Sequence, residues 1–281
     1  MRIAFFGTGL LGTGFIRHLL ATTGTVTVWN RTAAKAAPLA AAGARVAATV
    51  AEAAADAERV HLCVKDDAAV DAILAEAVPA LPAGAIVIDH TTTSIAGARA
   101  RAARLAAAGV GFLHAPVFMS PGAAARAKGI MLCAGPAEVY AKVDAALAAM
   151  TGELWHVGDD HGRAAAMKLC GNAMIIAITA GMADALAIGR AGGLAGADVL
   201  EVMTRLKPGG AIEVRGKKMA AGDFAASFEL TMARKDLGLM IDAVAGAPLA
   251  AIAAIADRAD ALIAAGHGAD DLGVLGLAPP G

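Results

Sequence analysis

Lys168 and Asn172 lie four residues apart in a long apolar stretch of the chain. On a helix this spacing places both side chains on one face, which is otherwise built mainly of alanine and leucine. A lysine among apolar neighbours loses hydration, so its pKa falls towards neutrality and it could give or take a proton. The amide beside it could orient a hydroxyl or carbonyl group. From spacing alone, the more ordinary explanation is a lysine that reaches solvent and a helix-capping amide.

A glycine-rich turn follows the first apolar run of the chain. Its sequence is Gly7-Thr8-Gly9-Leu10-Leu11-Gly12, and a helical stretch comes next. In a dinucleotide-binding turn the first glycine permits the tight bend, the second lets a pyrophosphate approach the backbone, and the third allows close helix–strand packing. The helix N-terminus presents unpaired N–H groups to the phosphates. Strand, turn and helix in this order predict a dinucleotide site at residues 7–12, in preference to a turn without a ligand.

The residues after the second expected strand indicate which dinucleotide binds. They are Asn30, Arg31 and Thr32, with Lys35 close behind. This position lies near the adenine ribose, where a carboxylate favours NAD and a basic residue favours NADP. No carboxylate is present, whereas Arg31 could pair with a 2′-phosphate and its neighbours could hydrogen-bond to it. We therefore expect NADPH rather than NADH. The alternative is that the two cations are solvated and Asn30 only starts a turn.

The fourth expected strand ends in a second candidate segment, Val64 and Lys65. The carboxyl ends of parallel strands face the ligand crevice, so we expect the backbone of these two residues to touch the cofactor. Asp66 and Asp67 follow and are explained as well by helix capping.

Strand and helix signals alternate through the first half of the chain. We expect strands near residues 2–6, 25–29, 44–47, 59–64, 85–89 and 111–115. This alternation predicts an α/β fold with a doubly wound, mostly parallel Rossmann sheet. Two further apolar runs, 129–134 and 153–157, flank an expected helix at 136–149 and could extend the sheet.

After Gly158 the pattern becomes all-helical. We expect helices near residues 161–192, 196–205, 231–244 and 248–265, and a loop-rich tail. The chain thus divides into an NADP-binding domain, 1–158, and an all-helical domain for substrate and dimerisation, 159–281. The most apolar stretch, Ala164–Ile188, carries lysine, asparagine and aspartate side chains. We therefore expect a buried helix of a soluble protein and no membrane span.

Composition excludes several classes of function. Lys and Arg number 24 against 25 Asp and Glu, so the net charge of −1 gives no basic stripe for nucleic acid. Cys63, Cys133 and Cys170 are too widely spaced for a disulfide framework or a zinc site, and we expect no metal. Met1-Arg2 leads directly into the first strand, which does not fit a secretory signal. We expect a cytoplasmic protein.

Three other segments complete a recognisable order of motifs. They are Asp89-His90-Thr91-Thr92-Thr93-Ser94, His114-Ala115-Pro116-Val117-Phe118-Met119-Ser120 and Arg234-Lys235-Asp236-Leu237. Together with the glycine turn and the Gly162…Lys168-x-x-x-Asn172 segment, this order resembles the β-hydroxyacid dehydrogenase family over essentially the whole chain. That family includes 3-hydroxyisobutyrate dehydrogenases and glyoxylate/succinic semialdehyde reductases.

The resemblance implies a role for each segment. Lys168 would be the general acid/base and Asn172 a substrate-orienting amide. Thr91 would line the substrate side of the cleft and Thr92 the cofactor side, while Lys235 would close over the cofactor. The implied reaction is hydride transfer between NADPH and the carbonyl or hydroxyl carbon of a small hydroxy acid or semialdehyde. The family also implies a homodimer or homotetramer.

One segment departs from the family pattern Asp-Ala-Pro-Val-Ser-Gly-Gly. Here Phe118 and Met119 are bulky, and with Ser120 they would line a smaller or more apolar substrate pocket, unless they only pack. A less polar carbonyl substrate is one alternative. An imine reductase is another, since such relatives share the layout, the NADPH preference and apolar pockets, although they usually lack a lysine at position 168. A non-catalytic dinucleotide-binding protein is a third, against which Lys168 and Asn172 argue. We expect His114 to be structural.

Overall fold

A computed structural model describes residues 2–277 of the chain. The chain forms two compact units, which we call the Rossmann unit, Met1–Asn172, and the helical unit, Ala173–Gly281. The division lies within α9 (His161–Ala191), C-terminal to the predicted boundary at residue 158. The first turns of α9 belong to the Rossmann unit because Ala164 and Met167 pack with Leu132 and Val157.

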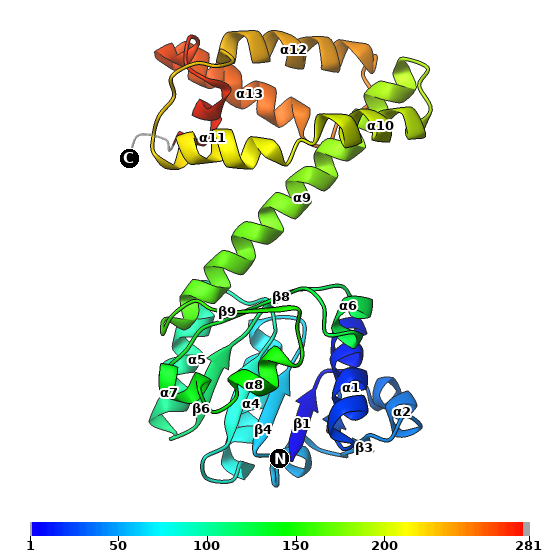
Figure 1. Ribbon diagram of the computed structural model, residues 1–281, viewed down its shortest axis with the longest axis vertical. Helices are drawn as coiled ribbons and strands as arrows, with labels where there is room; N and C mark the ends of the chain where they lie inside the picture. Colours follow the sequence, from blue (N-terminus) through cyan, green and yellow to red (C-terminus); the bar gives the residue numbers. More distant parts are fainter. Residues whose placement is uncertain (1, 278–281) are drawn as a thin grey trace. The chain divides into compact units, whose positions relative to one another are not determined.

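Six parallel strands form the main sheet of the Rossmann unit, in the order β3-β2-β1-β4-β5-β6 (Figure 1). They are β1 (Ile3–Phe6), β2 (Thr27–Trp29), β3 (Arg45–Val46), β4 (Arg59–Leu62), β5 (Ile86–Asp89) and β6 (Gly111–His114). The central strands β1, β4 and β5 are buried along their whole length, as parallel strands covered on both faces should be. The predicted doubly wound sheet is confirmed.

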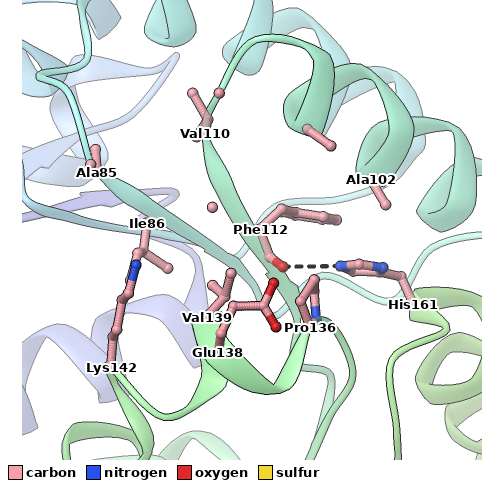
Figure 2. Close-up of a pocket in the computed structure, with 14 residues that line it drawn as sticks. Ala85, Ile86, Ala102, Val110, Phe112, Pro136, Glu138, Val139, Lys142 and His161 are labelled. Atoms are coloured by element: carbon pink, nitrogen blue, oxygen red, sulfur yellow. Dashed lines mark hydrogen bonds between the residues drawn. The ribbon is translucent and has the colours of Figure 1, made fainter.

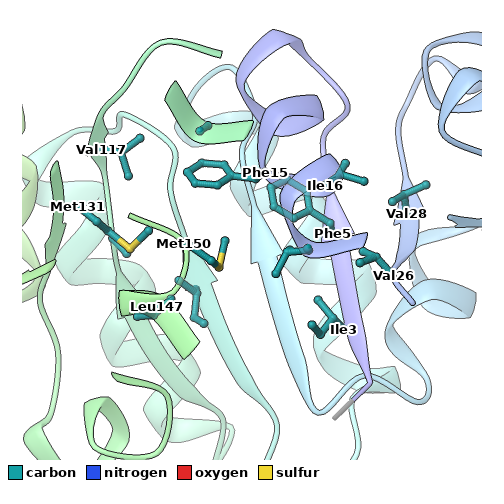
Figure 3. Close-up of a cluster of buried hydrophobic side chains, with 14 of the residues drawn as sticks. Ile3, Phe5, Phe15, Ile16, Val26, Val28, Val117, Met131, Leu147 and Met150 are labelled. Atoms are coloured by element: carbon teal, nitrogen blue, oxygen red, sulfur yellow. The ribbon is translucent and has the colours of Figure 1, made fainter. Parts of the chain in front are cut away.

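Helices connect these strands and cover the sheet. They are α1 (Leu10–Thr23), α2 (Ala33–Ala40), α3 (Val50–Ala54), α4 (Asp67–Ala77), the 3-10 turn η1 (Val78–Ala80) and α5 (Ile95–Ala107). Successive strand side chains point to opposite faces, so Phe5 and Phe6 enter different cores. Figure 3 shows Phe5 packed with Phe15 and Ile16 of α1. Burial of an aromatic side chain of this kind stabilises the fold by about 1.5–3 kcal/mol.

The later apolar runs form a second sheet, so the expectation that they extend the main sheet is wrong. This sheet has the order β7-β8-β9, with β7 (Val117–Phe118), β8 (Ile130–Cys133) and β9 (Glu153–His156). The ladder along β6 ends at Pro116, which has no N–H to donate. The expected helix at 136–149 is two short ones, α7 (Ala137–Tyr140) and α8 (Asp144–Ala148). A further short helix, α6 (Pro121–Ala125), follows β7.

The helical unit contains the rest of α9 and four further α-helices among the described residues. These are α10 (Gly196–Leu206), α11 (Gly210–Ala220), α12 (Leu230–Ala243) and α13 (Ile252–Leu262), followed by the turns η2 (Ile263–His267) and η3 (Leu272–Gly276). Leu230, Ala259 and Val274 lie at the centre of its core. The carboxylate of Asp184 accepts hydrogen bonds from the backbone N–H groups at the start of α13, which fixes that helix to α9.

The middle of α9 is exposed, contrary to the expectation of a buried helix. In the single chain, the apolar side chains on this part of the helix are between 47% and 67% exposed to solvent: Met174, Ile175, Ile176 and Ile178. By length and composition alone α9 could also cross a membrane, which for one helix is weak evidence. The apolar side chains of this helix, which we expected to lie in the core of the chain, are therefore on its surface.

Candidate active site at the carboxyl ends of the strands

The glycine turn has the geometry that a pyrophosphate requires. Gly7 adopts φ +101°, and a Cβ there would collide with the carbonyl oxygen of Cys63. A Cβ on Gly12 would collide with the carbonyl oxygen of Gly7. A Cβ on Gly9, in contrast, would meet nothing within 4 Å. The first and third glycines are thus required by the fold, whereas the second keeps a space open beside the backbone.

The start of α1 leaves donors available at this space. Gly9 is the N-cap residue and provides no side-chain cap, and the first turn has no acidic residue. The hydroxyl of Thr8 is buried and has no hydrogen-bond partner within residues 2–277. Unpaired N–H groups, a positive helix end and an orphaned hydroxyl all fit a bound phosphate. The residues present therefore fit a dinucleotide.

The segment after β2 contains one residue with a structural role, Asn30, and two exposed cations, Arg31 and Lys35. The Asn30 side chain accepts a hydrogen bond from the Thr8 N–H (3.1 Å) and donates one to the Thr32 carbonyl (2.9 Å), so it ties β2 to the glycine turn. Arg31 and Lys35 are exposed and have no ion-pair partner in the described part of the chain. These two cations remain available for a phosphate.

The ends of β4 and β5 are joined at the crevice. The Val64 N–H donates to the Thr91 hydroxyl (3.1 Å), and the Thr91 N–H donates to the Asp89 carboxylate (2.9 Å). Thr91 is buried and Thr92 is exposed at the rim. Lys65 is exposed, with its ammonium 3.4 Å from Asp66. Asp66 caps α4 by accepting from the Ala69 N–H, as one of the two interpretations proposed.

The three predicted substrate residues after β6 have different surroundings. Ser120 caps α6, since its hydroxyl accepts a hydrogen bond from the Ala123 N–H (3.1 Å). Met119 packs against the core beneath α1. Phe118 is half-buried and faces α9, where its ring lies against Gly171. Of the three, Phe118 is the side chain that contacts Lys168.

The lysine and the asparagine share a helix face, as their spacing predicted. Lys168 Nζ donates to Asn172 Oδ1 over 2.8 Å and lies 4.1 Å from the centre of the Phe118 ring. The lysine is 8% exposed, and burial lowers the pKa of its ammonium group. A desolvated lysine with a depressed pKa is suited to proton transfer near neutral pH.

The lysine and the glycine turn are on the same edge of the sheet. The turn follows the carboxyl end of β1, and β7 with Phe118 follows the carboxyl end of β6. Behind β7, α6 packs on α1, where Gly14 leaves room for the Pro121 carbonyl and Ala124. The glycine turn and Lys168 therefore both lie at the edge of the sheet where the strands end.

Two family profiles match consecutive parts of the chain. Residues 2–158 match the NAD-binding domain of 6-phosphogluconate dehydrogenase. Residues 162–276 match the NAD-binding domain of NADP-dependent 3-hydroxyisobutyrate dehydrogenase. The chain belongs to the β-hydroxyacid dehydrogenase family.

The relatives of this chain include proteins named for two kinds of reaction, dehydrogenation of a hydroxy acid and reduction of an imine. An uncharacterized oxidoreductase of Shewanella frigidimarina is 31% identical over 86% of this chain and 84% of its own length. A 3-hydroxyisobutyrate dehydrogenase of Pseudomonas aeruginosa is 34% identical over 60% of each chain. Among solved structures, an imine reductase from Myxococcus stipitatus in complex with NADP+ has a TM-score of 0.90 and 26% identity over 98% of both chains. The chain is an NAD(P)-dependent oxidoreductase, and these relatives leave open whether it acts on a C–O or a C–N bond.

One predicted site residue, Lys235, belongs to the helical unit. Lys235 lies on α12 of the helical unit, half-exposed, with its ammonium 3.0 Å from the Asp236 carboxylate. Its implied role of closing over the cofactor stays a prediction. Within residues 2–277 no three His, Cys, Asp or Glu side chains are grouped so that they could hold a metal ion.

Sequence reasoning missed a buried polar network beneath the crevice. His61 Nδ1 lies 2.9 Å from His90 Nε2, and the other ring nitrogen of His90 lies 2.8 Å from the Ala115 carbonyl. Asp89 is fully buried and lies 3.8 Å from the Arg101 guanidinium. The signal available in the sequence was histidine within or directly after short buried strands: His61 in β4, His90 after β5 and His114 in β6. His114, predicted to be structural, is also fully buried, 3.7 Å from Asp89.

Acidification to pH 5 is expected to destabilise the protein through this network. Burial holds the pKa of His90 at about 4 and also lowers the pKa of His61. Between pH 6.5 and pH 4 the unfolded chain therefore binds protons that the folded chain excludes, and stability falls as pH falls. His90 alone contributes a loss of about 2 kcal/mol at pH 5. The free energy of unfolding, obtained by denaturant titration at pH 7 and at pH 5, measures this loss. His90→Gln should reduce this difference, and an equal difference in the variant would contradict the assignment.

A separate hollow of about 340 Å³ lies at the other edge of the sheet (Figure 2). Ile86 and Gly111, the first residues of β5 and β6, line it together with Phe112 and His161. His161 is within hydrogen-bond distance of the Phe112 carbonyl (2.9 Å). Because the dinucleotide turn follows the opposite, carboxyl ends of the strands, this hollow is distinct from the crevice.

Proposed function

We propose that the chain is an NADPH-dependent reductase of a small carbonyl compound, with Lys168 as its general acid. The observation that carries the proposal is the ammonium group itself, buried on Phe118 and hydrogen-bonded to Asn172. NADPH, when bound, supplies a hydride to the carbonyl carbon. Lys168 gives a proton from Nζ to the oxygen that becomes the alkoxide, and the resulting amine regains a proton from water. Its positive charge also stabilises the developing oxyanion.

The Rossmann unit supports the choice of cofactor. The open space at Gly9 and the N-terminus of α1 would hold the pyrophosphate. The exposed Arg31 and Lys35 would hold the 2′-phosphate that distinguishes NADPH from NADH. The complex of the Myxococcus imine reductase with NADP+ agrees with this choice. The test is to follow the oxidation of NADPH and of NADH by absorbance in the presence of each candidate substrate. The candidates are glyoxylate, semialdehydes, aromatic aldehydes and cyclic imines, so one screen tests both cofactor and substrate.

Imine reduction is the second candidate, favoured by the apolar Phe118 and by the high structural similarity to an imine reductase. In this reaction Lys168 would protonate the imine nitrogen, which makes the carbon a better hydride acceptor. Faster NADPH oxidation with cyclic imines than with any aldehyde would select this candidate. The reverse order would select carbonyl reduction.

We also propose that the enzyme is a homodimer in which α9 is part of the interface. Exposed apolar side chains such as Ile175 and Ile176 gather on this helix, and patches of this kind mark association sites. The double variant Ile175→Glu/Ile176→Glu is expected to halve the mass measured by light scattering during size exclusion. Ala100→Glu, at an exposed position of α5 in the Rossmann unit, is the control and should keep the wild-type mass. A monomeric wild-type protein would contradict the proposal.

A further inference from the structure

The Phe118 ring fits a notch in α9 that a missing side chain creates. A Cβ on Gly171 would collide with the ring atoms Cζ and Cε1. Lys168 precedes this glycine by three residues, so it lies on the same helix face, and its ammonium lies over the ring. The absence of a side chain at Gly171 thus allows the Phe118 ring to reach Lys168.

The surroundings of the ammonium leave it little freedom. A lysine ammonium has three N–H donors. One donates to Asn172 Oδ1. The face of the Phe118 ring covers a second direction and attracts the charge by a cation–π interaction. Within residues 2–277 no carboxylate lies within ion-pair distance of Lys168. One donor direction is left for an incoming acceptor atom.

We propose that Phe118 positions Lys168 and selects substrates whose reacting carbonyl or imine carries apolar rather than carboxylate substituents. This inference rests on the proposed reductase function and narrows its substrate class. A single free N–H matches the single oxygen or nitrogen of the reacting group. A substrate carboxylate placed against the Phe118 ring would lose its hydration and would not find hydrogen-bond donors for both of its oxygens. The free energy of binding such a substrate would therefore be less favourable. The neighbouring Ser120 hydroxyl already serves as the cap of α6.

Two substitutions of Phe118 should move the pKa of Lys168 in opposite directions. Phe118→Leu keeps the apolar cover but removes the ring face, so the pKa should fall by about half a unit. Phe118→Ser admits water, so the pKa should rise towards the ordinary value. The pKa can be followed by NMR of reductively ¹³C-methylated lysines, with the Lys168→Arg spectrum assigning the signal. Ile130→Val trims the paired strand within the same apolar cluster and should leave the pKa unchanged.

A matched pair of aldehydes tests the selectivity. Butanal and succinic semialdehyde differ mainly in a terminal carboxylate. Wild-type kcat/KM should favour butanal, and Phe118→Ser should shift the ratio towards succinic semialdehyde by at least about tenfold, equivalent to about 1.4 kcal/mol. Ile130→Val should keep the wild-type ratio. An unchanged ratio in the serine variant, or pKa shifts of the same sign in both Phe118 variants, would overturn the proposal.

The two readouts separate this inference from the function on which it rests. If the wild-type enzyme reduces no carbonyl or imine, the proposed function fails, while the NMR titration still decides whether Phe118 positions the ammonium. If the serine variant does not fold, the leucine variant decides: a lowered pKa supports the positioning role, and an unchanged pKa refutes it.

Discussion

Replacing Lys168 with alanine is expected to lower kcat/KM by about a thousandfold. In the proposed mechanism the lysine supplies both a proton and a positive charge to the oxygen of the reacting group, and general acid catalysis together with oxyanion stabilisation has this magnitude. Affinity for NADPH should change little, because the glycine turn and the cations after β2 form a separate part of the crevice. Steady-state kinetics and a fluorescence titration with NADPH measure the two quantities.

The pH profile and two further variants complete this test. Burial lowers the pKa of Lys168, and the proposed reduction uses its protonated form. Reductive activity should therefore decline as pH rises through a value below the ordinary lysine pKa. Lys168→Arg keeps the charge but is too weak an acid to exchange a proton, so it should restore only part of the rate. Lys142→Ala, at an exposed lysine of the Rossmann unit, is the control. Wild-type turnover in Lys168→Ala would refute the assigned role.

Gly9→Ala is expected to abolish most dinucleotide binding without loss of stability. Gly9 has φ −69°, which alanine adopts without strain, and its Cβ would project into open space. That space is where a pyrophosphate would meet the backbone, so Kd for NADPH should rise by about a hundredfold, or about 2.8 kcal/mol. Calorimetric titration and thermal unfolding of the same sample measure both effects.

Gly12→Ala is the matched comparison for this substitution. Its Cβ would collide with the Gly7 carbonyl oxygen, so this variant should lose thermal stability as well as binding. If Gly9→Ala binds NADPH as the wild-type enzyme does, the open space beside the turn is not the pyrophosphate site. Equal stability of the two variants would show that the turn accommodates side chains more readily than its backbone contacts indicate.

The sequence was sufficient to predict the elements whose signals are local. Strands such as β1 and β5 are short apolar runs, and the glycine turn comes between a strand and a helix, so both could be placed closely. The shared face of Lys168 and Asn172 followed from helical spacing alone. The family resemblance then supplied their roles, which neither charge nor spacing could provide.

Long-range choices were not predictable in this way. β7 has two residues, Val117 and Phe118, and its pairing with β8 depends on a partner distant in sequence. Helix α11 begins at the second glycine of the pair Gly209-Gly210 and has no buried residue, so its sequence lacks the apolar periodicity that reveals helices. Apolar composition also did not reveal whether α9 is covered within its own chain. The contact between Phe118 and Lys168 joins β7 to α9, and the other two strands of the second sheet lie between these elements in the sequence.

Gly14 has a consequence for how new specificities could arise in this fold. The absence of a side chain at this position seats the chain after Phe118 directly on α1, the helix that begins at the glycine turn. Lengthening that loop would disturb α1 along with the position of Phe118. Natural divergence and laboratory redesign should therefore proceed by exchanging side chains at positions 118 and 119 on a fixed main-chain path, and insertions there should be selected against.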